Sequence, residues 1–130
     1  MLEKAKQDFP NVHFEQLDLL SEVIPATLPT DFDFIVSAYV LHEFSLTDKA
    51  KVLERYAQQL KDTGAFIIGD IAFETVEQRE TAKASLKNRW DPEESPWAAD
   101  EAKPILEKAG FSSEYVQLSS CAGIFSITKK

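Results

Sequence analysis

The chain has 130 residues, of which 44% are hydrophobic and 28% charged, and its formal net charge is -8. This length and composition fit one globular domain with one core, so residues 1–130 are treated as a single domain. An acidic surface repels phosphate backbones and anionic lipid headgroups, which disfavours nucleic acid and membranes as partners. No apolar stretch approaches the length of a membrane span, and the N-terminus lacks the apolar centre of a signal peptide.

The cysteine and histidine counts exclude two further classes. A single cysteine, Cys121, rules out an internal disulfide and favours a reducing, cytoplasmic setting. With only two histidines beside it, the chain offers too few ligands for a structural zinc site, and we expect no metal.

The first thirty residues predict a helix, a strand and a loop. Apolar residues at helical spacing indicate a helix over residues 2–9, and early alternation indicates a strand over residues 12–20. Asp18 falls where that strand should run out into a loop; the alternative is an ordinary turn-forming or helix-capping acid. Residues 21–30 contain two prolines and are predicted to form a loop.

The most informative stretch follows directly. Phe32, Phe34, Ile35 and Val36 form a nearly unbroken apolar run, which is typical of a parallel strand buried on both faces. Ligand crevices in open α/β sheets lie outside the carboxyl ends of strands. The alternative is a core strand followed by an ordinary loop, with the histidine solvated. The candidate site residues at this end of the strand are Ser37, Ala38, Tyr39, His42 and Glu43.

A second strand is predicted after a capped helix. Ser45 begins a capping-box pattern, and the helix after it presents an apolar face and is expected to end at Gly64. The apolar run over residues 65–72 then predicts a strand parallel to the first, joined by a right-handed crossover. Asp70 lies near the end of this strand and is a second crevice candidate, although a turn acid is the favoured interpretation.

The remaining elements are a polar helix, a break, a further helix and a hairpin. Thr75 starts a helix that runs to about residue 90 with a thin apolar face, so we expect it to dock loosely. Trp97 is interpreted either as part of a lid over the crevice or as a residue covering the core edge. A helix from about residue 100 to Gly110 should hold Pro104 in its first turn. Residues 113–118 and 123–128 alternate and predict an antiparallel hairpin at a sheet edge.

The ordered set of motifs resembles a known family. The set comprises Gln16-x-Asp18, the run from Phe32 to Ser37 followed by Val40-Leu41-His42, the segment from Leu60 to Gly64, and Glu107-Lys-Ala-Gly110-Phe111. This order is similar to the carboxyl two-thirds of a class I S-adenosylmethionine-dependent methyltransferase of the small-molecule type. The resemblance implies an α/β fold with a three-layer Rossmann-like sheet, N-terminally truncated and mostly parallel, with a C-terminal antiparallel hairpin.

The resemblance also implies roles for individual residues. Asp18 would accept a hydrogen bond from the adenine amine of S-adenosylmethionine, and the backbone amide of Leu19 would face a ring nitrogen. Ser37 and Ala38 would lie beneath the methionine portion of the cofactor. The residues that would face the transferred methyl group or the substrate are His42 and Glu43; with Tyr39 they are candidates for catalysis, and no catalytic residue is assigned.

The sequence departs from the family at its start. None of the four glycines forms a Gly-x-Gly loop, and the two opening strands of the family have no counterpart, so Met1 resembles an internal methionine of a longer domain. We therefore expect weak or absent binding of S-adenosylmethionine, because half of the pocket is missing. In the family's strand order the missing strands would leave an apolar edge on the strand over residues 32–38. That edge should either form a homodimer or pair directly with the strand over residues 12–20.

Two functions follow from the resemblance. The first is methyl transfer to a small-molecule acceptor by the full-length protein, with residues 74–99 forming a substrate cover. The alternative is an inactive methyltransferase-like module for dimerisation or regulation, so whether this chain is itself an enzyme is left open. Another doubly wound nucleotide-binding domain is disfavoured by the terminal hairpin.

Overall fold

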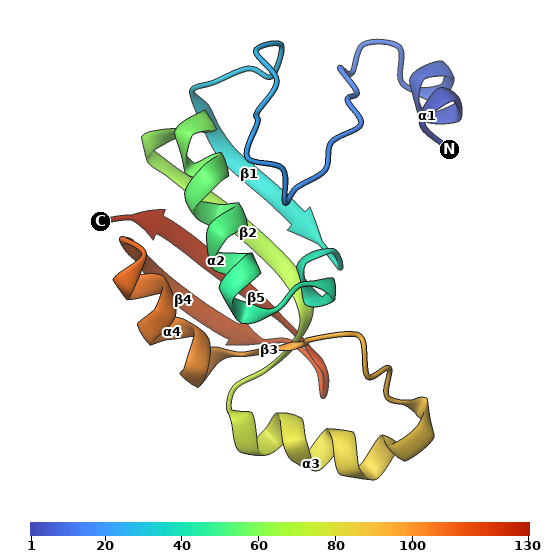
Figure 1. The fold of residues 1–130 in the computed structure, drawn as a ribbon, viewed down its shortest axis with the longest axis vertical. Coiled ribbons are helices and arrows are strands. Elements are labelled where there is room, and N and C mark those ends of the chain that lie inside the picture. Colours follow the sequence, from blue (N-terminus) through green and yellow to red (C-terminus); the bar gives the residue numbers. More distant parts are fainter.

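Five strands form one sheet in the computed structural model, which describes residues 1–130 (Figure 1). The strand order is β1-β2-β5-β4, and β3 pairs with β2. β1 and β3 run parallel to β2, whereas β5 is antiparallel to both β2 and β4, so the α/β fold with a C-terminal hairpin is confirmed. The strands are β1 (Phe32–Ala38), β2 (Leu60–Phe73), β3 (Trp97–Ala98), β4 (Phe111–Gln117) and β5 (Ala122–Lys129).

Helices α2 and α4 lie against one face of the sheet, and α3 projects beyond its lower end in Figure 1. α1 lies apart from the sheet at the end of the N-terminal coil. None of the helices is both long enough and apolar enough to cross a bilayer. The helices are α1 (Leu2–Asp8), α2 (Leu46–Tyr56), α3 (Val76–Leu86) and α4 (Ala99–Lys108), with short 3-10 turns η1 (Leu41–Glu43), η2 (Ala57–Gln59) and η3 (Lys87–Arg89).

The core fills the space between the sheet and the two covering helices. Alternate residues of β2 and β5 point toward the helices, because side chains alternate between the two faces of a strand. Burial of these apolar side chains is the main favourable contribution to folding. The central buried residues are Val52 and Leu53 of α2, Phe66 and Ile68 of β2, Ala102 and Leu106 of α4, and Phe125 and Ile127 of β5.

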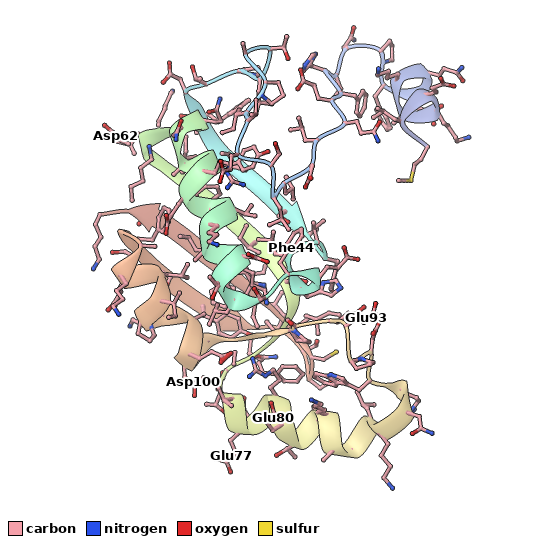
Figure 2. The ribbon with its side chains drawn as sticks, viewed as in Figure 1. Phe44, Asp62, Glu77, Glu80, Glu93 and Asp100 are labelled. Carbon is pink, nitrogen blue, oxygen red and sulfur yellow. The ribbon has the colours of Figure 1, made fainter.

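The acidic residues are spread over the surface and do not form one cluster. Figure 2 shows the side chain of Asp62 at one end of the molecule and those of Glu77 and Glu80 at the other. The side chain of Asp62 is fully exposed. The net charge of -8 is therefore distributed over the surface in solvent-facing carboxylates, where water screens their mutual repulsion.

The predicted helix starts are confirmed by their caps. The Ser45 hydroxyl accepts a hydrogen bond from the Asp48 amide at 3.2 Å, and the Thr75 hydroxyl accepts one from the Gln78 amide at 3.1 Å. α3 buries none of its residues, as its thin apolar face predicts. α4 begins at Ala99, but Pro104 lies beyond its first turn, contrary to expectation.

The predicted helix end at Gly64 is wrong. α2 ends at Tyr56, a 3-10 turn follows, and β2 already begins at Leu60, so Gly64 lies inside β2. A Cβ atom at Gly64 would lie 2.8 Å from the backbone oxygen of Asp33 and 2.8 Å from Leu60 Cδ1. Glycine is needed here because β1 and the Leu60 side chain approach the β2 backbone closely, and not because a helix ends.

Gly64→Ala should destabilise the protein by about 1–3 kcal/mol, because the added methyl group overpacks this contact. Gly69→Ala is the matched control in the same strand, since nothing lies within 4 Å of a Cβ atom there. Urea unfolding followed by circular dichroism measures both variants. Equal stability of the two variants would contradict a close approach at Gly64.

Residues 12–20 do not form the predicted strand. The segment is irregular, and β1 pairs with β2 only, so the expected direct pairing of the two segments is also wrong. The backbone N–H and C=O groups of a strand form hydrogen bonds to a neighbouring strand, and residues 12–20 have no such neighbour. Its apolar side chains are still used, because Leu17 and Leu19 pack against the core.

β1 is an edge strand and is not buried on both faces. Phe34 is 64% exposed and Val36 is 69% exposed, whereas Ile35 is half-buried and packs against the core. No strand pairs with β1 on the side away from β2. The apolar run of β1 is therefore buried on one face only. The backbone groups along its free edge have no strand partner.

Candidate active site

The chain turns sharply at the carboxyl end of β1. Tyr39 has a φ of 57°, a left-handed conformation that is uncommon for a bulky residue, and its amide donates to the Gly69 oxygen at 2.9 Å. The side chain of Tyr39 itself faces solvent. This reversal leads into η1, which carries His42 toward β2 and leaves Glu43 exposed. The turn separates the three catalytic candidates and buries only His42.

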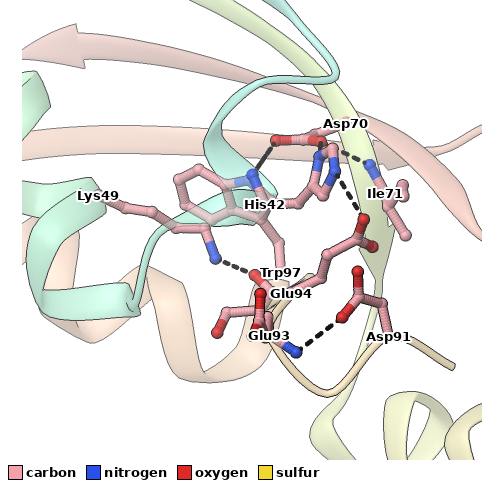
Figure 3. Close-up of polar contacts among 9 residues, drawn as sticks. His42, Lys49, Asp70, Ile71, Asp91, Glu93, Glu94 and Trp97 are labelled. Carbon is pink, nitrogen blue, oxygen red and sulfur yellow. Dashed lines mark hydrogen bonds and ion pairs between the residues drawn. The ribbon is translucent and has the colours of Figure 1, made fainter. Parts of the chain in front are cut away.

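His42 is bound to Asp70 at two points. The ring atom Nδ1 lies 2.7 Å from Asp70 Oδ1, and the His42 backbone amide donates to Oδ2 at 2.9 Å (Figure 3). His42 is 7% exposed, so the alternative of a solvated histidine is wrong. A buried carboxylate against Nδ1 fixes the ring orientation and directs Nε2 away from β2.

Asp70 is the centre of a buried polar cluster. Besides His42 it accepts hydrogen bonds from the Ile71 amide at 2.9 Å and from the Trp97 indole at 3.0 Å. It is 1% exposed, so the favoured interpretation of a turn acid is wrong. The sequence does contain a signal for this polar cluster, namely an acid inside an otherwise apolar strand. A carboxylate buried in such a strand requires hydrogen-bond donors around it.

The segment before β3 closes over His42. The Ser95 amide donates to the His42 oxygen at 2.5 Å, and Glu94 Oε1 lies 3.7 Å from His42 Nε2. Trp97 is fully buried between β2 and the Phe125 ring, whose centroid lies 4.6 Å from its own. Trp97 therefore belongs to the core, and the interpretation as a lid residue is wrong.

Lys49 of α2 is a buried cation in the same cluster. Its ammonium donates to the Ser95 oxygen and lies 4.9 Å from the centroid of the Trp97 ring (Figure 3). Burial lowers the pKa of Lys49 to about 8, although the negative charge of Asp70 opposes this shift. No carboxylate forms an ion pair with it. No local pattern indicates this role, because a lysine in a helix is normally solvated.

A cavity of about 400 Å³ lies between β1, α2 and the N-terminal coil. It is lined by Leu19 together with Ser37 and Ala38, so three of the four predicted cofactor contacts come together. Asp18 does not line it; its carboxylate accepts a hydrogen bond from the Leu20 amide at 3.0 Å in an exposed turn. The other lining residues are mainly apolar side chains of β1, α2 and β2.

The cavity fits only part of S-adenosylmethionine. Its apolar walls suit the faces of an adenine ring. Among its lining residues Ser37, Tyr56 and Gln59 carry neutral polar groups, and Gln59 already donates to the Pro29 oxygen at 3.0 Å. The ribose hydroxyls and the charged methionine end therefore find no carboxylate or cation in this lining, and we derive no methyl-transfer step through the cofactor.

Solved methyltransferases share this fold. The mitomycin 7-O-methyltransferase MmcR superposes with a TM-score of 0.73 and 18% identity over 99% of this chain and 39% of its own. RosA of Streptomyces davawensis, an N,N-8-amino-8-demethyl-D-riboflavin dimethyltransferase, superposes with a TM-score of 0.71 and 18% identity over 98% of this chain and 39% of its own. A TehB-like S-adenosylmethionine-dependent methyltransferase of Corynebacterium glutamicum superposes with a TM-score of 0.63 and 23% identity, over 99% of this chain and 62% of its own.

The chain belongs to the methyltransferase domain family, whose model matches residues 1–110. This family uses S-adenosylmethionine as its methyl donor. No curated protein sequence matches the chain. The chain spans about two fifths of the length of the first solved structures that it matches.

Proposed function

We propose that the protein carrying this domain transfers a methyl group from S-adenosylmethionine to a small-molecule acceptor. The observation that carries the proposal is the cavity in which Leu19 of the N-terminal coil meets Ser37 and Ala38 of β1. These residues come from two separate segments, yet they line the same mainly apolar cavity, whose size suits a nucleobase. In this chain alone we expect the affinity for the cofactor to be weak, because the cavity lacks groups for its charged end.

His42 is the residue we assign to the acceptor side of the site. Its Nε2 atom faces Glu94 at 3.7 Å, while Asp70 holds Nδ1 on the opposite side of the ring. A neutral imidazole held in this way can accept a proton at Nε2 from an acceptor hydroxyl or amine. Glu43 and Tyr39 are exposed and support no comparable role from their contacts.

We assign residues 74–99 to a substrate cover. Beneath α3 lies a second cavity of about 400 Å³, bounded by Phe73, Trp90 and Glu94 among others. The rings of Phe73 and Trp90 stack with centroids 6.3 Å apart. Since α3 buries no residue, the α3 part of this cover can move with little loss of core packing, whereas Trp97 at its far end stays in the core.

Adenosine should bind weakly in the β1 cavity, and amide chemical shifts measured by NMR test this. We expect saturable shifts at Leu19, Ser37 and Ala38, and their loss in Ser37→Phe, because Ser37 lines the cavity and shares the half-buried face of β1 with Ile35. The matched control is Ala84→Phe on the exposed side of α3, which should leave the shifts unchanged. Shifts confined to other residues would overturn the cavity as the nucleoside site. Micromolar affinity for S-adenosylmethionine would show that the incomplete fit has been misjudged.

The second candidate is an inactive methyltransferase-like module that acts through dimerisation or regulation. It is favoured by the free edge of β1 beside the exposed side chains of Phe34 and Val36. A domain that uses this edge to bind another chain needs no cofactor. Binding of adenosine at the β1 cavity would favour the first candidate over this one.

A further inference from the structure

Residues 91–96 form a strap that covers His42. The strap lies between two cavities, of about 350 Å³ and about 400 Å³, and its Glu94 lines both of them. His42 lines neither cavity, although Glu94 Oε1 lies 3.7 Å from its Nε2 atom (Figure 3). Because His42 is 7% exposed, a molecule in either cavity can reach Nε2 only after the strap moves.

The strap is a short loop between two anchored tryptophans. Trp97, directly after it, is fully buried, and the ring of Trp90, directly before it, stacks on Phe73. None of residues 91–95 is buried, so the loop itself adds little to the core. A segment with few buried apolar contacts can open locally while the elements at its two ends stay in place.

Three polar contacts hold the strap over His42. The Ser95 amide donates to the His42 backbone oxygen at 2.5 Å. From α2, the Lys49 ammonium donates to the Ser95 oxygen. From α3, the Arg79 guanidinium donates to the Pro96 oxygen at 3.1 Å. Cations from two different helices therefore bind two neighbouring carbonyls of the strap.

Arg79 is the stronger of these two cationic contacts. Its guanidinium also donates to Glu101 of α4 at 2.5 Å, so its charge is paired while it holds the strap. Lys49 has no carboxylate partner, and burial lowers its pKa, which means that the closed strap disfavours its charge. The desolvation of Lys49 offsets its bond to Ser95, and no comparable cost applies to the paired Arg79.

We propose that the strap is a gate over His42 and that Arg79 is the positioning residue that latches this gate closed. Opening moves Glu94 away from Nε2 and makes the imidazole accessible from the cavity beneath α3. Closing restores the bond from Ser95 and excludes water from the ring. The role of the gate in admitting a methyl acceptor rests on the proposed function, whereas the opening itself does not.

Chemical modification of the two histidines measures the opening. Diethyl pyrocarbonate acylates accessible neutral imidazoles, and mass spectrometry of peptides separates His42 from His13. The side chain of His13 is 61% exposed and serves as the internal reference. Arg79→Gln should speed the modification of His42 relative to His13 by about tenfold or more, because a hydrogen bond from a charged group is lost.

Lys83→Gln is the matched control for Arg79→Gln. It removes the same charge one turn further along α3, from an exposed side chain that donates no hydrogen bond to the strap. The ratio of His42 to His13 modification should therefore stay at the value of the unmodified chain. Equal ratios for the two variants would overturn Arg79 as the latch.

Hydrogen exchange of the Ser95 amide separates opening of the gate from global unfolding. This amide donates to His42, so it exchanges when the strap lifts. In the unmodified chain it should exchange faster than the amides of Phe125 and Ile127, because β5 is paired on both sides. Arg79→Gln should speed exchange at Ser95 by about tenfold or more and leave β5 unchanged. Exchange of Ser95 at the rate of the β5 amides would show that the strap opens only with the whole fold, and the gate would be refuted.

Both measurements are made without cofactor or acceptor. Failure of the gate and failure of adenosine to bind in the β1 cavity are therefore separate results. Circular dichroism of each variant verifies that it remains folded.

Discussion

Replacing Asp70 with asparagine is expected to lower the free energy of unfolding by about 3 kcal/mol. The carboxylate accepts hydrogen bonds from the His42 amide and ring, the Ile71 amide and the Trp97 indole, all inside the core. Asparagine keeps one acceptor oxygen and turns an NH₂ group toward these donors, so at least one buried donor is left without a partner. Each such loss involving a charged acceptor costs about 1.5–3 kcal/mol.

Asp62→Asn is the control for this substitution, because its side chain is fully exposed and its contact with Lys129 spans 3.5 Å. Its stability should change by less than about 0.5 kcal/mol. Chemical unfolding followed by tryptophan fluorescence suits the measurement, since Trp97 donates directly to Asp70. Similar stabilities for the two variants would mean that Asp70 does not organise the core.

The second large effect concerns Lys49 and alkaline pH. Its pKa is about 8 in the folded chain against 10.5 for the unperturbed group, so between these values the unfolded state binds more protons. Stability should therefore rise with pH across this window, by about 3 kcal/mol from the shift of roughly 2.5 units. Below pH 8 the folded chain holds a buried ammonium, and its desolvation lowers stability throughout that range.

Lys49→Met isolates this contribution, because methionine matches the length of the stem and cannot be protonated. The difference in unfolding free energy between the two proteins should change by about 3 kcal/mol from pH 7.5 to pH 10.5. Taking the difference removes the titration of Tyr56 and Tyr115, whose pKa values burial raises. Lys51→Met, on an exposed position of the same helix, should show no such change. Parallel pH profiles for all three proteins would contradict the lowered pKa.

Local signals predicted the elements that depend on nearby residues. Ser45 and Thr75 cap their helices because each hydroxyl needs only the amide three residues on. The parallel unit of β1, α2 and β2 follows from apolar runs at a spacing that a helix can bridge. Gly64 is an exception, because a glycine after a helical pattern ends a helix more often than it allows a neighbouring strand to approach closely.

Contacts between distant residues were beyond reach of these signals. The strand predicted over residues 12–20 has the right alternation but no neighbour to pair with, and alternation alone cannot supply one. Lys49 and Ser95 are 46 residues apart in the chain, and Asp70 and Trp97 are 27 apart. Whether a lysine, an aspartate or a tryptophan is solvated or buried depends on which segments fold over it.

By itself the sequence determined the α/β class, the order of most elements and the family resemblance, because periodicity, caps and turns act over a few residues. Only the tertiary structure decided that β1 has a free edge, that Leu19 meets Ser37 and Ala38 across a cavity, and that Asp70 gathers His42 and Trp97. These outcomes depend on long-range packing and on the donors that a buried carboxylate must find, and neither is written in any one segment.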